Sequence, residues 1–488
     1  MIQKTVKIHD KFQFEIKLGY EIKKEREKTS YDIETYFFIP NNLDINRYTY
    51  SKKIFYKDIH GYIRLKTPTL LLRQIAGSKS SPIPVLRDGI ETLLTRRDRE
   101  SHENFESHVK MICSIVKSAL RDHVSFTANN MPPDIPALIN EFVTESTKVV
   151  EAYRDLKPVI TVPTVPDKVL SIYRFGDEFL SHNIEIYGFR LLKRIDRMRS
   201  ADMAALREKL VTFIKSEYDY RIACNYQSPL DEEKDKEILI YRQGVLKKYI
   251  GSVLFLDTRR ESEGKFLEHL LFGIAAGLSM VFATLVAFIA HNQYGNFTFP
   301  VFVALVVSYI FKDRIKEFAR LYFINKASKF RFDQKTSIYA DDGPEIGICK
   351  EAVNFIKESE LPNRIKSIRK RAAIADVDNQ WRGEKVIYYR KRVTLFSKRM
   401  KKVYKEYNIE GVNDIIRFNI GRFLEKMDNP SRTIYTLKGD TVCEVPGDRV
   451  YYVNLIIKIS RGEKTFFKRA RLVLNRDGIK RIEEIDAS

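Results

Sequence analysis

The run from Leu270 to Ala290 constrains this chain more than any other feature, because twenty-one consecutive residues carry no ionisable side chain. At about 1.5 Å per helical residue, such a run spans roughly 31 Å, close to the hydrocarbon thickness of a bilayer. Core helices of soluble proteins usually have shorter apolar runs, of about ten to fourteen residues. The sequence therefore predicts a membrane-spanning helix over about 269–290.

A second apolar run, Phe297 to Phe311, follows after a short polar connector. Its fifteen residues cover only about 22 Å as a helix, so Tyr294 and a long cation such as Lys312 or Arg314 must complete the span, or the bilayer must thin. We expect a second span over about 297–313, and a transmembrane hairpin over 267–311.

Cations flank the two runs on their outer sides only, and the connector 291–300 has neither Lys nor Arg. By the positive-inside rule, this pattern predicts that both termini are cytoplasmic, which in a bacterium means an inner or plasma membrane protein. The flanking cations are Lys247, Lys248, Arg259, Arg260 and Lys265 before the first run, and Lys312, Arg314, Lys316 and Arg320 after the second.

Small residues recur at helical spacing along the first run, which lets another helix approach closely in lipid. They could pack against the second span of the same chain or against another subunit, and the sequence leaves both open. The predicted helix-packing residues are Gly273, Ala275, Gly277, Ser279, Ala283 and Ala287. Because neither run has a charge near its middle, a pore would need many copies of the chain.

Hydrophobic periodicity predicts the fold of the part before the membrane. Apolar and polar residues alternate over 12–22 and 31–39, as expected for a pair of antiparallel strands in a small sheet over 1–45. Apolar residues then recur at helical spacing through most of 46–265, which predicts a cytoplasmic helical bundle forming one domain with that sheet. The helical stretches are about 100–123, 134–156, 167–199, 201–218 and 232–255.

The part after the membrane, 314–488, is predicted to be a basic cytoplasmic α+β domain. Helical patterns cover about 349–359 and 411–427, and strand patterns follow over 433–437, 449–459, 465–474 and 479–485. Turn sequences between the last strands, such as Asn475-Arg-Asp-Gly478, indicate an antiparallel meander. The predicted fold class is thus an α+β membrane protein, with the transmembrane hairpin between an N-terminal sheet-plus-bundle domain and this C-terminal domain.

Positive charge is concentrated after the hairpin: of the net +21, residues 312–488 contribute 40 Lys and Arg against 25 Asp and Glu. The densest stretch lies within 364–405, where aromatic residues are interleaved with cations. This mixture is typical of sites for anionic lipid headgroups or for nucleic acids and nucleotides, or of a solvated basic face. The candidate anion-binding residues are Arg364, Lys366, Arg369, Lys370, Arg371, Arg390, Lys391, Arg392, Lys398, Arg399, Lys401 and Lys402.

Motifs for common chemistry are missing from the sequence. It contains no Walker loop, GxGxxG after a strand, GxSxG or HExxH, and its four cysteines form no CxxC pair. His102 and Glu106 share a helical face, but long helices commonly expose such residues to solvent. We therefore assign no catalytic, cofactor or metal residues and expect no cofactor.

The function expected from these features is that of a non-enzymatic two-span membrane protein. Its cytoplasmic domains would bind or sense a partner and couple it to a self-associating hairpin, as in a scaffold, a signalling protein or an oligomeric pore-type effector. Expected partners are the bilayer, anionic headgroups and a second copy of the chain. One alternative is a membrane-tethered nucleic-acid or nucleotide-binding protein that uses 364–405. A further alternative is a lipid-acting enzyme of unrecognised type.

Overall fold

The computed structural model describes residues 4–22, 27–77, 81–96, 98–129, 134–163, 165–198, 203–226, 233–263, 265–295, 298–328, 331–340, 343–370 and 383–486. The chain forms two compact units, each assembled from separate stretches of sequence. The sheet unit comprises 1–63, 257–400 and 413–488, and the helical unit comprises 64–256 and 401–412.

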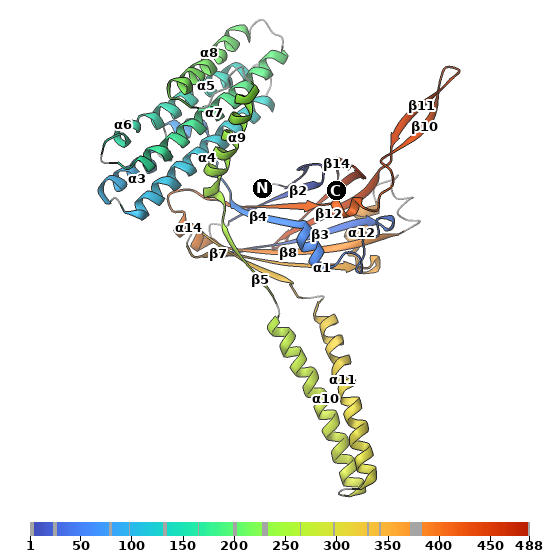
Figure 1. Ribbon diagram of the computed structural model, residues 1–488. Coiled ribbons are helices and arrows are strands. Elements are labelled where there is room, and N and C mark those ends of the chain that lie inside the picture. The colour runs from blue at the N-terminus through green and yellow to red at the C-terminus, as the bar shows by residue number, and fades with distance from the viewer. Residues whose placement is uncertain are drawn as a thin grey trace. The chain divides into compact units, whose positions relative to one another are not determined.

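An eight-stranded antiparallel sheet is the largest element of the sheet unit (Figure 1). Its strand order is β14-β13-β12-β3-β8-β7-β6-β5. The strands are β3 (Lys28–Pro40), β5 (Asp257–Ser262), β6 (Gln334–Tyr339), β7 (Glu345–Ile356), β8 (Glu384–Phe396), β12 (Tyr451–Arg461), β13 (Lys464–Asn475) and β14 (Gly478–Ile485). β3 lies between β8 and β12, so residues near the start of the chain pair with residues near its end.

A second sheet has four strands in the order β1-β2-β9-β4. They are β1 (Lys4–Ile8), β2 (Gln13–Glu21), β4 (Ile59–Leu65) and β9 (Gly411–Asn419). A separate hairpin is formed by β10 (Ser431–Lys438) and β11 (Thr441–Asp448). The short helices of this part are α1 (Lys52–Asp58), α12 (Asn363–Lys370), α14 (Ser397–Val403) and α15 (Gly421–Leu424).

Aromatic side chains fill the core between the two sheets. The ring of Phe418 on β9 lies 5.2 Å from that of Phe37 on β3, 5.5 Å from that of Phe14 on β2 and 5.6 Å from that of Phe55 on α1. All four side chains are buried. Burying each contributes about 1.5–3 kcal/mol, so this cluster is a main source of the packing energy that joins the sheets.

A cluster of buried charges lies in the same core. The Lys391 ammonium on β8 is 2.7 Å from Asp414 Oδ2 on β9 and 3.4 Å from Glu351 Oε1 on β7. Tyr20 donates a hydrogen bond of 2.9 Å to Asp414, and Tyr389 donates one to Glu351. Burial lowers the pKa of Lys391, but the charges of Asp414 and Glu351 outweigh it and raise that pKa well above its ordinary value. Lys391 therefore stays charged inside the fold.

The longest helices of the helical unit are α4 (Arg99–Asn129) and α7 (Asp167–Met198), and shorter helices surround them (Figure 1). The shorter ones are α2 (Leu72–Gly77), α3 (Ile83–Arg96), α5 (Ile135–Arg154), α6 (Lys157–Ile160), α8 (Ala204–Ala223) and α9 (Glu233–Gly251). Gly176 on α7 permits close packing with its neighbours. A Cβ at that position would lie 2.3 Å from the Tyr153 hydroxyl on α5 and 2.8 Å from Val109 Cγ1 on α4.

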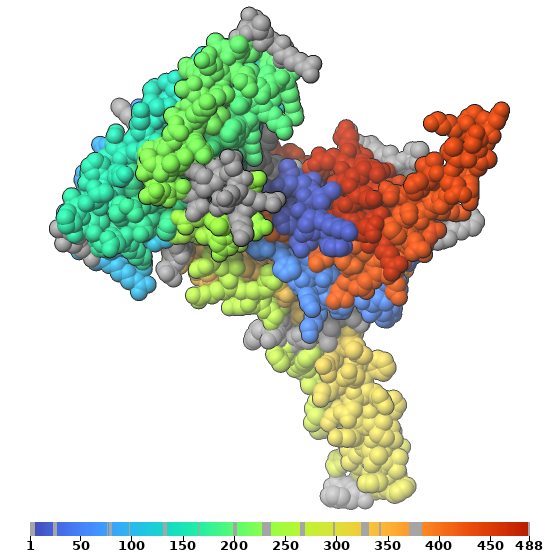
Figure 2. Space-filling model, turned by 45° about the horizontal axis from the view of Figure 1, so that its top comes forward, coloured from blue at the N-terminus to red at the C-terminus, as the bar shows by residue number. Residues whose placement is uncertain are grey.

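Two further long helices, α10 (Lys265–Tyr294) and α11 (Phe299–Ser328), lie side by side in both views (Figure 1; Figure 2). The Ser308 hydroxyl on α11 donates to the Ala283 carbonyl on α10 at 3.3 Å. Of the predicted packing residues, Ala275 and Ser279 are buried, Ala283 and Ala287 are half-buried, and Gly273 and Gly277 are exposed. The small residues thus occupy more than one face of α10.

Within the part of the chain that the structure describes, one helix is long and apolar enough to cross a membrane. This stretch is His269–Tyr294 of α10, and only 11% of its most apolar part is buried. α11 does not meet the same criterion, because its apolar start is followed by charged residues from Lys312 onward. One candidate span is therefore established by length and composition, where the sequence predicted two.

The helical predictions for the region before the apolar runs are confirmed by α4, α5, α7, α8 and α9, and the C-terminal meander by β12, β13 and β14. The predicted pairing within 1–45 is wrong, because β2 lies between β1 and β9 whereas β3 joins the other sheet. The predicted helix over 349–359 is also wrong, since this stretch forms most of β7. Of the predicted helix over 411–427 only Gly421–Leu424 (α15) is helical, because 411–419 forms β9.

The two units also group the chain differently from the predicted domains 1–265 and 314–488. The reason is strand pairing: β3 and β12 contact each other across more than 400 residues of sequence, as in the pair Asn454 and Phe38. No local pattern in either strand specifies such a distant partner.

The buried ion cluster yields a first prediction. Substitution Lys391→Met should lower the free energy of unfolding by about 3–5 kcal/mol, because it leaves Asp414 and Glu351 buried without their cation. Chemical denaturation followed by tryptophan and tyrosine fluorescence measures the change.

The matched control is Lys398→Met, which removes an exposed lysine whose ammonium is 3.5 Å from the Glu27 carboxylate. This control should stay within about 1 kcal/mol of wild type. Equal effects of the two substitutions would show that the Lys391 cluster does not stabilise the sheet unit.

Candidate ligand site in the helical unit

Helix α7 carries an unusual polar segment in its middle. Six polar or charged residues between positions 177 and 185 are buried: Asp177, Glu178, Ser181, His182, Asn183 and Glu185. At 3.6 residues per turn these positions cover neighbouring stripes of the helix that point toward the other helices of the unit. Buried charges are stable only when they are paired, so the partners of this segment define the candidate site.

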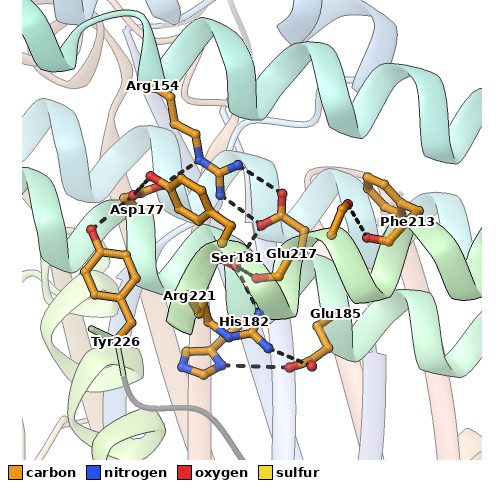
Figure 3. Close-up of polar contacts among 11 residues, drawn as sticks. Arg154, Asp177, Ser181, His182, Glu185, Phe213, Glu217, Arg221 and Tyr226 are labelled. Carbon is orange, nitrogen blue, oxygen red and sulfur yellow. Dashed lines mark hydrogen bonds and ion pairs between the residues drawn. The ribbon is translucent and has the colours of Figure 1, made fainter. Parts of the chain in front are cut away.

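Arg154 at the end of α5 connects two of the carboxylates (Figure 3). Its guanidinium contacts Asp177 Oδ1 at 3.1 Å and both oxygens of Glu217 on α8 at 3.1 and 2.9 Å. Tyr220 and Tyr226 donate to Asp177 Oδ2 at 2.6 and 3.0 Å. Burial lowers the pKa of Arg154, but its bonds with Glu217 and the charge of Asp177 outweigh burial and raise that pKa.

Arg221 on α8 continues the network from this point (Figure 3). Its side chain is fully buried and contacts Glu185 Oε1 at 2.7 Å, and it donates to the Ser181 hydroxyl at 3.0 Å. Ser181 in turn donates to Glu217 Oε2 at 2.7 Å. The network therefore runs without a break from Asp177 to Glu185 and joins α5, α7 and α8.

His182 lies at the far end of the network, where α9 contacts α7. The Nε2 atom of His182 is 4.0 Å from Glu178, the Nδ1 atom is 4.0 Å from Glu185, and the Gln243 amide is 3.4 Å from Nδ1. Arg242 binds both oxygens of Glu178, at 3.0 and 2.7 Å. Each carboxylate beside His182 thus has an arginine of its own.

A cavity of about 230 Å³ opens beside His182, between α4, α7 and α9. We call it the α9 cavity. Its polar lining comes from Lys117 on α4, His182 and Asn183 on α7, and Gln243 and Lys247 on α9. The remaining lining is apolar: Phe179, Ile186, Ile240 and Leu246, with Gly244 completing the wall. A largely apolar cavity with a few convergent polar groups is typical of a small-molecule site.

Positive charge dominates one side of the α9 cavity. Burial, together with the neighbouring cations Lys247, Arg121, Arg64 and Arg190, lowers the pKa of Lys117 to about 8. Among the residues that the structure describes, neither Lys117 nor Lys247 forms an ion pair with a carboxylate. The lining therefore offers an uncompensated cationic group beside an apolar wall.

A second, larger hollow of about 530 Å³ lies between α5 and α8. Its lining is Val143, Ala205, Glu208, Lys209, Thr212, Phe213 and Ser216. The one cation in this set, Lys209, donates to Asn140 at 2.6 Å. Because its charged groups do not converge on the space, this hollow is a weaker candidate for ligand binding than the α9 cavity.

In the described ranges, no group of three or more His, Cys, Asp or Glu side chains is placed to hold a metal ion. The carboxylates of the network are held by arginines and tyrosines instead. Chemically, the arrangement can therefore bind and orient a ligand through lysine, histidine and amide groups. The ion network holds α7, which carries His182 and Asn183, against α5, α8 and α9, whereas Lys117 comes from α4.

The predicted anion-binding residues of 364–405 do not all lie at the surface. On β8, Arg390 and Arg392 share one face, where Arg390 lies over the Phe332 ring and Arg392 contacts Asp32 at 2.6 Å. Lys391 points to the opposite face and is buried, because side chains alternate along a strand. The basic run is thus divided between the surface and the core.

Most of the other predicted residues lie on α12 or α14. Arg364 on α12 is exposed and Lys366 is half-buried, while Arg369 is buried and contacts Glu384 at 2.8 Å. Lys398, Arg399, Lys401 and Lys402 are all exposed on α14, so these four cations lie together on one short helix. The side chain of Lys370 and all of Arg371 lie outside the described residues.

Sequence reasoning missed the polar segment of α7 because the stretch 167–199 has an ordinary helical stripe. The available signal was a set of polar residues at the spacing of the apolar ones, since Asp177 and Ser181 follow Tyr173 at intervals of four. A charged residue on the apolar face of a helix is buried only with a partner, and that partner cannot be identified from one sequence.

The ion network yields a second prediction. Substitution Arg154→Met should lower the free energy of unfolding by roughly 2–4 kcal/mol, because Asp177 and Glu217 remain buried after their shared cation is removed. Thermal and urea denaturation of the full chain measure the effect.

A suitable control is Arg207→Met, which breaks a pair with Asp196 whose two side chains are both about half exposed. It should change stability by less than about 1 kcal/mol. If Arg154→Met were equally mild, the network would not be what holds α5, α7 and α8 together.

The chain was also compared with known proteins. No protein-family model, no curated protein and no solved structure matches it.

Proposed function

We propose that this protein is a non-enzymatic integral membrane protein with two spans and both termini in the cytoplasm. In this proposal the helical unit binds a ligand, and ligand binding changes the state of α10 and α11. These two helices associate with α10 and α11 of other copies of the chain. The observation that carries the proposal is the exposed apolar surface of α10.

Large apolar side chains on α10 and α11 are more exposed than is usual on a protein surface in water. On α10, Phe288 is 74% exposed and Val281 67%, and on α11, Phe299 is 77% exposed. Soluble monomers rarely expose contiguous apolar patches of more than a few hundred Å². A bilayer would cover both helices at once, since their apolar parts lie along each other.

The order of the elements supports a link between ligand and membrane. Helix α9, which supplies one wall of the α9 cavity, ends at Gly251. A 3-10 turn (Ser252–Leu254) and the short strand β5 then lead to α10, which begins at Lys265. A change in the position of α9 would therefore act on the segment that leads into α10. A ligand can shift the equilibrium between two positions of α9 only as far as its affinities for the two positions differ.

The distribution of small residues supports self-association. Ala275 and Ser279 are buried, whereas Gly273 and Gly277 are exposed, and a Cβ added at either glycine would have no atom within 4 Å. Small residues at helix surfaces in lipid allow a second helix to approach closely. This exposed pair is where we propose that α10 contacts another copy of the chain.

The two alternative functions have less support. Of the cations proposed for nucleic-acid binding, Arg369 and Lys391 are buried and paired with carboxylates, so they cannot belong to a binding surface. For a lipid-acting enzyme, the described residues show the α9 cavity but no pairing of nucleophile and base in its lining. We therefore retain the membrane-anchored sensor.

The membrane assignment is tested by extraction. Wild-type protein should remain in the pellet when membranes are washed with alkaline carbonate. The double substitution Val281→Lys and Leu285→Lys should release the protein or prevent insertion, because each lysine near the middle of a span costs about 2.5–3.5 kcal/mol.

The control places two lysines at exposed apolar positions outside α10 and α11, Ile434→Lys and Leu437→Lys on β10, and should behave like wild type. Release of wild-type protein by carbonate would contradict the proposal.

The topology is tested with cysteine labelling. In intact cells, a membrane-impermeant maleimide should label Asn292→Cys, in the polar stretch between the two apolar runs, but not Lys438→Cys at the tip of the β10–β11 hairpin. Permeabilised cells should label both. Labelling of Lys438→Cys in intact cells would place the sheet unit outside the cytoplasm.

A further inference from the structure

The strongest unexplained feature of the helical unit is the charge of the α9 cavity. Lys117 and Lys247 line it from α4 and α9, and His182 lines it from α7. The two carboxylates next to His182 are already bound, Glu178 by Arg242 and Glu185 by Arg221. The protein therefore supplies counter-charges for its buried arginines but, among the described residues, no ion-pair partner for these two lysines.

We propose that the α9 cavity binds a small organic phosphate, with the phosphate between Lys117 and Lys247 and a compact apolar group against Phe179, Ile186 and Leu246. This inference deepens the proposed function, because it names the class of ligand that the helical unit senses. It does not depend on membrane insertion.

The charge and size of the cavity select this class of ligand. Two lysines match the roughly −1.5 to −2 charge of a phosphate monoester near neutral pH. The volume of about 230 Å³ lies below the roughly 300–1,000 Å³ of drug-sized sites, so it suits one ring or short chain attached to one phosphate. The apolar side of the cavity distinguishes such an ester from inorganic phosphate.

Lys117 is better placed than a surface lysine to respond to the ligand. Its ammonium lies 5.3 Å from the centre of the Phe179 ring, and its charge is opposed by Lys247, Arg121, Arg64 and Arg190. A dianion beside Lys117 would offset the repulsion between Lys117 and these cations. The pKa of Lys117 would then rise from about 8 toward its ordinary value. Near pH 8 to 9, ligand binding should therefore take up protons.

The sign of the pH dependence follows from this linkage. Below pH 8 Lys117 is already protonated in the free protein, and binding is at its tightest so long as the phosphate is doubly charged. As pH rises above 8, the free protein loses that proton and must regain it to bind, so affinity should fall. His182 and Lys247 line the same cavity, and Arg121, which is paired with Asp122, Arg64 and Arg190 also act on Lys117, so the Lys117 substitution is needed to assign the effect.

The experiment is isothermal titration calorimetry on the full chain in detergent, with phenyl phosphate as the probe. Phenyl phosphate should bind, and inorganic phosphate and neutral phenol should bind at least roughly tenfold more weakly. Lys117→Met and Lys247→Met should each weaken binding by roughly ten- to a hundredfold, and Lys117→Arg should restore most of it. At pH 8.5, the heat in buffers of different ionisation enthalpy should show proton uptake in wild type and not in Lys117→Met.

The control variant is Lys215→Met, an exposed lysine on α8 that does not line the cavity, and it should bind like wild type. Thermal unfolding without ligand checks that the variants fold. Lys117→Met should be at least as stable as wild type at pH 7, because it removes a charge that the fold disfavours.

A second arm identifies the source of the phosphate. If dihexanoyl phosphatidic acid binds more tightly than phenyl phosphate and still requires Lys117, the phosphate belongs to a lipid headgroup. If phenyl phosphate binds more tightly, the ligand is a soluble metabolite. The proposal is overturned if neither probe binds, or if both bind equally well to Lys117→Met. Such a failure would leave the carbonate and topology results unchanged, so the two proposals fail separately.

Discussion

Compensation of buried charge is the constraint on which both units of this protein depend. In the sheet unit, Lys391 is held between Asp414 and Glu351, and strands β7, β8 and β9 must keep their register for these atoms to meet. Removing charged groups from water costs several kcal/mol per ion, so the arrangement is stable only as a complete set. The cluster thereby favours one alignment of the two sheets over others that would bury the same apolar area.

The helical unit follows the same rule with more partners. Three arginines, Arg154, Arg221 and Arg242, face four carboxylates of α7 and α8. Hydrogen bonds from Ser181, Tyr220 and Tyr226 complete the coordination of these carboxylates. Against this background Lys117 stands out, because it is half-buried beside other cations. That contrast is the physical reason for treating the α9 cavity as a binding site rather than a packing defect.

Local patterns in the sequence predicted much of the helical unit. The apolar stripe of Phe105, Val109, Ile112, Val116 and Leu120 identified α4, and all five side chains are buried. The same reasoning failed for β9, because Val412 and Ile416, four residues apart, fit both a helical and an extended period, and pairing with β2 decides between them. Strand partners and buried ion pairs depend on residues hundreds of positions apart, which one sequence does not connect.

The location of β3 has a consequence for the synthesis of the protein. Residues 28–40 pair with 384–396 of β8, so the whole stretch 41–383 must be translated before this central strand can be covered on that side. At about 5–20 residues per second, the delay is roughly 20–70 s. During that time the apolar strand β3 lacks its partner β8, while α10 emerges from the ribosome and, in our proposal, enters the bilayer. A nascent chain of this kind needs a chaperone or the membrane surface to cover β3 until β8 has been made. Truncation before β8 should therefore produce a fragment that aggregates.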